Sequence, residues 1–195
     1  MKVSVISLLA VSSAATAASL TKVQRQDSLL WPYATYRYWV NSGQWKEDPQ
    51  DQLLVVKNGV LADETTTIVT FDIPADVAGR TCKLVFDLWD RDVSTGTQQA
   101  DVFTATKPTG AERAAVSVET VSKQTAEFVV QSRDKHVGRI RVTAPGTANW
   151  IQSYQGYPEF ECPAGQMVGF EFVGAGDNMS LRWDIGVTGP RVQVV

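Results

Sequence analysis

A regular alternation of apolar and polar side chains, which begins near residue 65, is the feature that most limits how this chain can fold. A period of two places every second side chain on one face, as in a β-strand, whereas a helix repeats every 3.6 residues. Strands with one apolar and one polar face are typical of antiparallel sheets that cover each other. The apolar members of the alternating segments are Thr67, Val69, Phe71 and Ile73; Cys82, Leu84, Phe86 and Leu88; Ala126, Phe128 and Val130; Ile140 and Val142; Val168, Phe170 and Phe172; and Met179, Leu181, Trp183, Ile185 and Val187.

Turn-forming residues separate these segments at short intervals. Gly, Pro and Asp gather at 74–79, 94–96, 107–110, 145–146 and 174–177. Short strands with such spacing are typical of a sandwich or barrel. We therefore expect an all-β fold, an antiparallel β-sandwich that is jelly-roll-like or barrel-like.

The N-terminus has the three parts of a secretory signal peptide. Lys2 supplies a positive charge, residues 3–11 are largely apolar, and Ala15-Thr16-Ala17 fits the A-x-A cleavage pattern. The alternative, a transmembrane anchor, needs roughly 20 apolar residues. We expect a signal peptide at 1–17, one domain at 18–195, and a secreted, extracellular protein without membrane insertion.

The chain has two cysteines, Cys82 and Cys162, and one histidine. Two cysteines in an oxidising compartment most simply pair. Cys82 falls on the apolar face of its segment and Cys162 shares parity with Phe160, which predicts a disulfide buried between the sheets. Two free buried thiols are the alternative. A closed zinc site needs four ligands, so no metal site is expected.

Catalytic signals are weak. His136 lies in a polar run that resembles a hairpin tip, and no G-x-S-x-G nucleophile elbow is present. Neither spacing of the acids matches a known catalytic or calcium pattern. We expect no enzyme activity and no cofactor. The acids considered are Asp87, Asp90 and Asp92 at one strand end, and Glu159 and Glu161 on one short strand.

Aromatic side chains are the stronger candidates for a binding site. Trp150, Tyr154 and Tyr157 lie in the connection 145–158, whose fourteen residues predict a binding loop or an ordered Ω-loop. A second aromatic cluster lies in 30–45. Such rings stack on sugars or anchor protein interfaces, or they cap the open ends of a sandwich. We expect Trp183 to belong to the core.

The charge of the chain and a glycosylation motif indicate which kinds of partner and modification to expect. The net charge is −3 and no basic run is present, which gives no reason to expect nucleic acid or an anionic membrane as a partner. One sequon, Asn178-Met179-Ser180, falls in the turn-like run 174–178, where a glycan could be attached.

Two motifs carry a resemblance to a known family. Residues 74–88 read P-A-D-V-A-G-R-T-C-K-L-V-F-D-L, and residues 161–172 read E-C-P-A-G-Q-M-V-G-F-E-F. Together they resemble the fungal domain called the C-terminal domain of the ubiquitin-three-binding (But-type) protein, over about residues 68–187. The resemblance implies a filamentous-fungal secreted β-sandwich in which Cys82 and Cys162 are the family's paired cysteines, and it supplies no catalytic residues. Such proteins are also similar to fungal elicitors of hypersensitive cell death.

The function expected from the sequence is that of a secreted, non-enzymatic effector or elicitor. It would meet an unknown component of a host surface and act in virulence or plant defence. The alternative is a carbohydrate-binding or cell-wall module that uses Trp150, Tyr154 and Tyr157. A hydrolase and a purely structural surface protein remain further possibilities.

Overall fold

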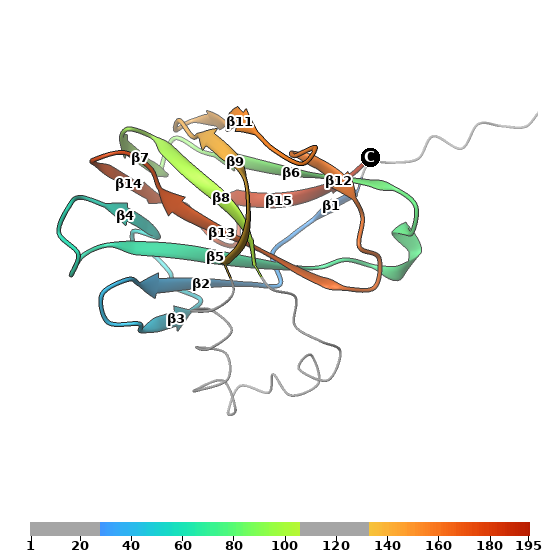
Figure 1. The fold of residues 1–195 in the computed structure, drawn as a ribbon, viewed down its shortest axis with the longest axis horizontal. Coiled ribbons are helices and arrows are strands. Elements are labelled where there is room, and N and C mark those ends of the chain that lie inside the picture. The colour runs from blue at the N-terminus through green and yellow to red at the C-terminus, as the bar shows by residue number, and fades with distance from the viewer. Residues whose placement is uncertain (1–27, 106–132) are drawn as a thin grey trace, which may run out of the picture.

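A computed structural model describes residues 28–105 and 133–195 (Figure 1). All strand pairings within these ranges are antiparallel, which confirms the all-β fold class. The expected signal peptide, the turn at 107–110 and the strand at 126–130 lie outside the described residues. No helix among the described residues has the length and apolarity needed to cross a membrane.

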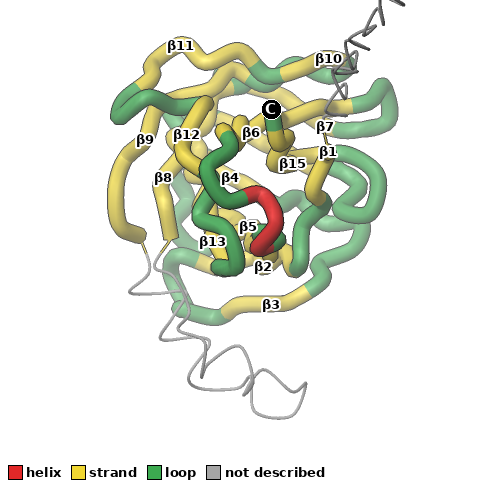
Figure 2. The backbone as a smooth tube through the Cα atoms, turned by 90° about the vertical axis from the view of Figure 1, so that its right-hand side faces the viewer, coloured by secondary structure: helices red, strands yellow, loops and turns green. Residues whose placement is uncertain are grey.

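The described strands form two curled sheets. The five-stranded sheet runs β1 (Ser28–Leu30), β15 (Gly189–Val194), β6 (Thr81–Leu88) and β10 (Gly146–Thr147), with β12 (Glu159–Glu161) also on β6. The path of the ten-stranded sheet is β11 (Asn149–Ser153), β9 (Arg133–Arg141), β8 (Gln99–Ala105), β13 (Met167–Gly174), β5 (Thr65–Asp72), β4 (Val55–Lys57), β14 (Met179–Arg182) and β7 (Val93–Gly96). A hairpin of β2 (Ala34–Trp39) and β3 (Trp45–Glu47) pairs with β5. Figure 2 shows one 3₁₀ turn, Ala75–Val77, in red among the yellow strands.

The core lies between the two sheets and is rich in aromatic rings. Phe86 of the five-stranded sheet meets Phe172 of the other sheet with ring centroids 5.3 Å apart. The ring centroid of Trp183 lies 5.1 Å from that of Phe86, and the Trp183 side chain is 2% exposed. Its expected place in the core is thus confirmed. Burial of such large rings supplies much of the free energy that holds a sandwich together.

The predicted disulfide is present and buried. Cys82 and Cys162 are bonded with their Cα atoms 5.0 Å apart, and both belong to the core cluster. Cys82 lies on β6, and Cys162 directly follows β12, which pairs with β6. The bond therefore ties two neighbouring strands of one sheet at its core face and does not join the two sheets.

The expected polar face of the central strands is not left in water. Thr66 and Thr70 of β5 and Glu171 of β13 are each at most 3% exposed. The alternation correctly places Phe170 and Phe172 on the core face, but in the middle of a large sheet the opposite face is covered as well.

The last alternating segment is shorter than the sequence predicts. β14 ends at Arg182, and residues 184–188 form a turn. The Asp184 carboxylate accepts a hydrogen bond from the Gly186 amide, and the Asp184 carbonyl accepts one from Thr188. An aspartate that bonds its own downstream backbone stops a strand. Ile185 and Val187 therefore do not continue β14.

Candidate functional site

β9 places the single histidine in the middle of a strand, so the predicted hairpin tip at His136 is wrong. β9 begins at Arg133, and His136 lies opposite Phe103 of β8. Ile140 and Val142 are buried in the core as predicted, so Arg139 and Arg141 point to the outer face. His136 and Arg139 thus meet on the outer face of the ten-stranded sheet.

A row of stacked side chains crosses the outer face of β8 and β9 and ends at Tyr154, which directly follows β11. The Arg133 guanidinium lies over the Phe103 ring, 4.8 Å from its centroid. Phe103 stacks on His136 at 4.7 Å, and Tyr154 meets His136 edge-on at 5.2 Å. We call Arg133, Phe103, His136 and Tyr154 the aromatic stripe.

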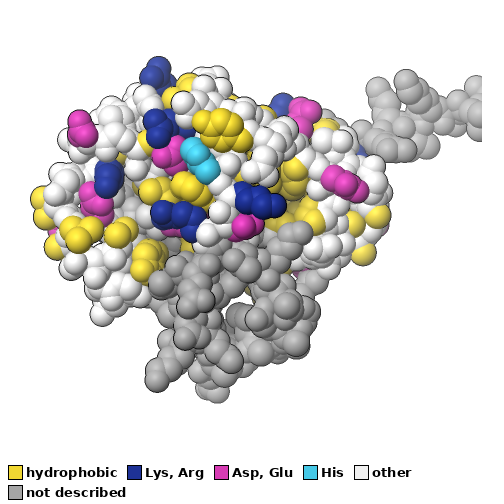
Figure 3. Space-filling model, viewed as in Figure 1, with side chains coloured by type: hydrophobic (Ala, Val, Ile, Leu, Met, Phe, Trp, Pro, Cys, Tyr) yellow, Lys and Arg dark blue, Asp and Glu magenta, His cyan; other side chains and the backbone are white. Residues whose placement is uncertain are grey.

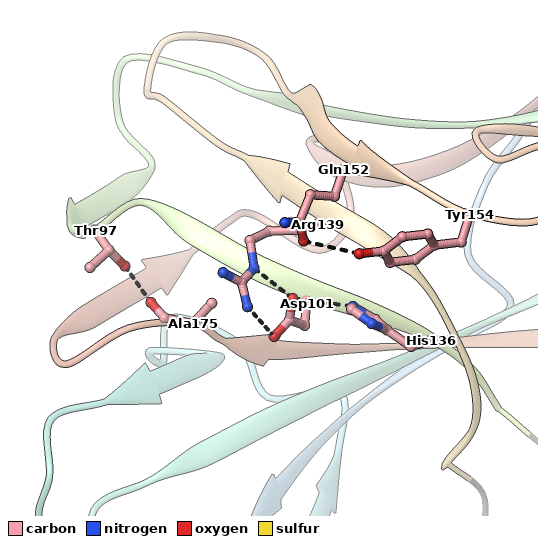
Figure 4. Close-up of polar contacts among 7 residues, drawn as sticks. All are labelled: Thr97, Asp101, His136, Arg139, Gln152, Tyr154 and Ala175. Carbon is pink, nitrogen blue, oxygen red and sulfur yellow. Dashed lines mark hydrogen bonds and ion pairs between the residues drawn. The ribbon is translucent and has the colours of Figure 1, made fainter.

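Ion pairs hold both sides of the aromatic stripe. Glu171 accepts hydrogen bonds from Nε and Nη2 of Arg133 at 2.9 and 2.6 Å. Asp101 accepts from Nε and Nη2 of Arg139 at 2.7 and 2.9 Å, and its Oδ1 lies 3.2 Å from His136 Nε2 (Figure 4). These hydrogen bonds raise the pKa of both guanidinium groups, because they favour the charged form.

The connection 145–158 is not a free binding loop. It contains β10, which pairs with β6, and β11, which pairs with β9. Gly138 of β9, at φ +153, makes the second pairing possible: an added Cβ would lie 2.4 Å from the Gln152 carbonyl and 2.8 Å from the Trp150 ring. The predicted Ω-loop is thus an edge strand followed by a tight turn.

The aromatic trio is divided between two environments. Trp150 and Tyr157 pack against the core, with their rings stacked 6.2 Å apart. Tyr157 also stacks on Phe160 at 5.2 Å, and burial raises the pKa of its hydroxyl to about 12. Tyr154 is 43% exposed and belongs to the aromatic stripe, where its hydroxyl donates to Gln152 at 3.4 Å (Figure 4).

Sugar stacking requires an open ring face, and the trio offers little of one. Trp150 and Tyr157 cover each other, while Phe103 lies between Arg133 and His136. The exposed side of the Tyr154 ring and its hydroxyl remain accessible to a partner. This geometry suits contact with a protein surface better than the flat stacking that sugar rings need.

The acids considered in the sequence have separate structural roles. Asp87 accepts a hydrogen bond from the Thr147 hydroxyl at 2.6 Å. Asp92 accepts from the backbone amides of Trp89 and Asp184, while Asp90 is exposed in the turn. Glu159 and Glu161 are exposed on β12, with Lys83 3.7 Å from Glu159. Among the residues described, no three His, Cys, Asp or Glu side chains are grouped to hold a metal ion.

The N-terminal aromatics divide in a similar way. Tyr36 is 4% exposed, and burial, followed by the charge of Glu47 and by Tyr33, raises the pKa of its hydroxyl. Trp31 is 48% exposed, with the Arg191 guanidinium 4.5 Å from its ring centroid. The buried Tyr36 and the exposed Trp31 therefore do not belong to one aromatic surface.

Asn178 is exposed in the turn between β13 and β14, as the predicted sequon requires. Its backbone carbonyl accepts a hydrogen bond from the Thr97 amide at 2.8 Å. The side chain is thus presented from a backbone that is held in place.

Sequence reasoning missed Asp101 and Phe103. Their signal was present, because Ala100 and Val102 alternate with them and are fully buried. Alternation gives the face of a residue but not its neighbouring strand, so the contacts with His136 and Arg139 were not predictable from it.

The fold and site define a disulfide-bonded antiparallel β-sandwich with a polar, aromatic outer surface. A family model described as the ubiquitin 3 binding protein But2 C-terminal domain matches residues 45–184. The chain belongs to this family, which confirms the family resemblance. Comparison with curated proteins and with solved structures gave no match.

Proposed function

We propose that this chain is a secreted, non-enzymatic binding protein that acts as an effector or elicitor on a host surface. The observation that carries the proposal is that the groups best suited to catalysis are engaged in structural contacts. Among the described residues, His136 is in contact with Asp101, Phe103 and Tyr154, none of which is a serine, threonine or cysteine nucleophile. Asp101 is in turn shared with Arg139. In the part of the chain that the structure describes, the histidine and the carboxylate therefore lack the third group of a Ser-His-Asp-type triad, which supports a binding role.

The direct test is infiltration of purified protein into leaves, with necrosis as the readout. His136→Ala and Asp90→Asn should leave necrosis nearly unchanged if no catalytic step is involved. Tyr154→Ala should weaken it, because an aromatic anchor that becomes buried at an interface is often worth about 2 kcal/mol or more. The matched control is Tyr33→Ala, a tyrosine that is 54% exposed and lies outside the aromatic stripe.

Two results would overturn the proposal. If folded His136→Ala or Asp90→Asn protein were inactive, an enzymatic mechanism would have to be considered again. If the wild-type protein caused no necrosis, the elicitor role would be wrong. Secretion is tested separately by N-terminal sequencing of protein from culture medium, with an N-terminus near Ala18 as the expected result.

Cell-wall glycan binding remains the competing proposal. A glycan array separates the two: array binding lost in Tyr154→Ala protein would support the glycan module. Trp150→Ala is a poor probe for either function, because its ring packs against the core and its loss would lower stability.

A further inference from the structure

The outer face of β9 is a basic and aromatic surface on an acidic protein. Arg133, Arg139 and Arg141 lie on it, against the two carboxylates Asp101 and Glu171. With His136 neutral, this face carries one positive charge more than negative, whereas the whole chain has a net charge of −3. Figure 3 shows the histidine in cyan among dark blue basic side chains and yellow apolar ones.

Both ion pairs leave part of each guanidinium available. Asp101 and Glu171 each bind the Nε and Nη2 side of their arginine, and no bond to Nη1 of Arg133 or Arg139 is present among the described residues. Arg141 is exposed, and its side chain forms no ion pair with any other described residue. Arg133 and Arg139 are thus positioned by their carboxylates but can still donate to a ligand, and the exposed Arg141 can do so as well.

The spacing of these donors follows the strand. Arg139 and Arg141 are two residues apart, which is about 7 Å along β9. An extended peptide has the same repeat, so carboxylates on every second residue match these two arginines. Ile151 of β11, the strand that pairs with this part of β9, and Tyr154, directly after β11, are each 43% exposed and can cover an apolar side chain.

We propose that the outer face of β9 and β11, which comprises Arg139, Arg141, Ile151 and Tyr154, docks an extended acidic segment of a protein partner that also carries an apolar or aromatic side chain. Charge complementarity selects the acidic segment and increases its rate of association. The exposed apolar side chains of Ile151 and Tyr154 favour a peptide over a polysaccharide. The ring faces of Phe103, Trp150 and Tyr157 are covered by neighbouring side chains, which also disfavours sugar stacking. This inference rests on the proposed function, since it names the partner of a binding protein.

The experiment measures binding of poly-L-glutamate and of a glutamate–tyrosine copolymer to the full secreted chain at low salt, with polygalacturonate as a sugar-borne carboxylate. We expect both peptides to bind, the copolymer more tightly, and binding to weaken as salt rises. Arg141→Gln should lower the affinity about fivefold. Tyr154→Ala should remove the advantage of the copolymer.

Lys46→Gln is the matched control for the loss of one charge. Lys46 is exposed on β3, which is separated from β9 by β2, β5, β13 and β8 and thus lies about 24 Å away across the sheet. Its substitution should leave the affinity unchanged. An equal loss in Lys46→Gln and Arg141→Gln would overturn the inference, as would tighter binding of polygalacturonate or no peptide binding at all.

The two proposals fail in different ways. Necrosis by wild-type protein without peptide binding would overturn the docking surface and leave the elicitor function standing. Peptide binding that Arg141→Gln weakens, in a protein that causes no necrosis, would overturn the elicitor function and support the surface.

Discussion

The two faces of strands β8, β9 and β13 differ in what holds their side chains in place. The inner face carries Phe172 and Ile140, which are buried in the core by contact with the second sheet. The outer face carries Phe103 and His136, which are only partly buried and are positioned by stacking and by ion pairs. Burial of apolar area dominates stability, whereas directional contacts mainly fix position and specificity. The residues that stabilise this protein most therefore lie on the inner face, and those that it can present to a partner lie on the outer face.

The largest expected difference between the faces comes from removing one phenylalanine ring on each. Phe172→Ala should lower the free energy of unfolding by about 3–5 kcal/mol, because it removes a fully buried ring and leaves a cavity. Phe103→Ala should cost less than half as much. Urea unfolding followed by tryptophan fluorescence measures both, and equal losses would show that the outer face is as important for stability as the core.

The next effect concerns the disulfide at the core face. Replacing Cys82 and Cys162 together by serine should destabilise the protein by about 2–5 kcal/mol, since the bond closes a loop of 80 residues. Thermal melting of the double variant measures the loss. Titration of native wild-type protein should detect no thiol, and an unchanged melting midpoint would contradict the prediction.

A smaller loss is expected at the ion pair between the buried Glu171 and the partly exposed Arg133 on the outer face. Glu171→Gln keeps the shape of the side chain but replaces one carboxylate oxygen by an NH2 group, so one hydrogen bond from Arg133 is lost and the other is weakened, which should cost about 1–3 kcal/mol. Glu159→Gln is the control, because its pair with Lys83 is exposed and is worth at most about 1 kcal/mol. Unfolding in urea at neutral pH tests both. If the two variants lost the same amount, burial of Glu171 would have no energetic consequence.

The smallest effect appears only at alkaline pH. The pKa of Tyr157 is raised to about 12 by burial, compared with about 10 for an unfolded tyrosine. The folded state therefore favours the protonated hydroxyl, and its contribution is complete below pH 10 and lost as pH rises towards 12. Tyr157→Phe cannot ionise, so its alkaline unfolding midpoint should be higher than that of wild type. Circular dichroism at rising pH measures the midpoint. The control is Tyr154→Phe at an exposed tyrosine, and its alkaline unfolding midpoint should equal that of wild type.

The sequence alone determined the local features of this protein. Alternation placed Phe170 and Phe172 inside, and the parity of Cys82 and Cys162 predicted a buried disulfide, because a strand sends successive side chains to opposite faces. Turn residues divided the chain into short antiparallel strands. The family motifs at 74–88 and 161–172 agreed with this fold. Each of these signals depends only on residues close together in the chain.

Tertiary structure decided everything that depends on which strands become neighbours. His136 lies in β9, beside Asp101 and Phe103, and not at the hairpin tip that the sequence predicts. The connection 145–158 contains an edge strand, β11, and is not a free loop. Tertiary structure also divided the aromatic trio, so that Tyr154 is exposed while Trp150 and Tyr157 pack against the core. Pairing between distant strands is fixed by the packing of the whole core, and no local pattern encodes that choice.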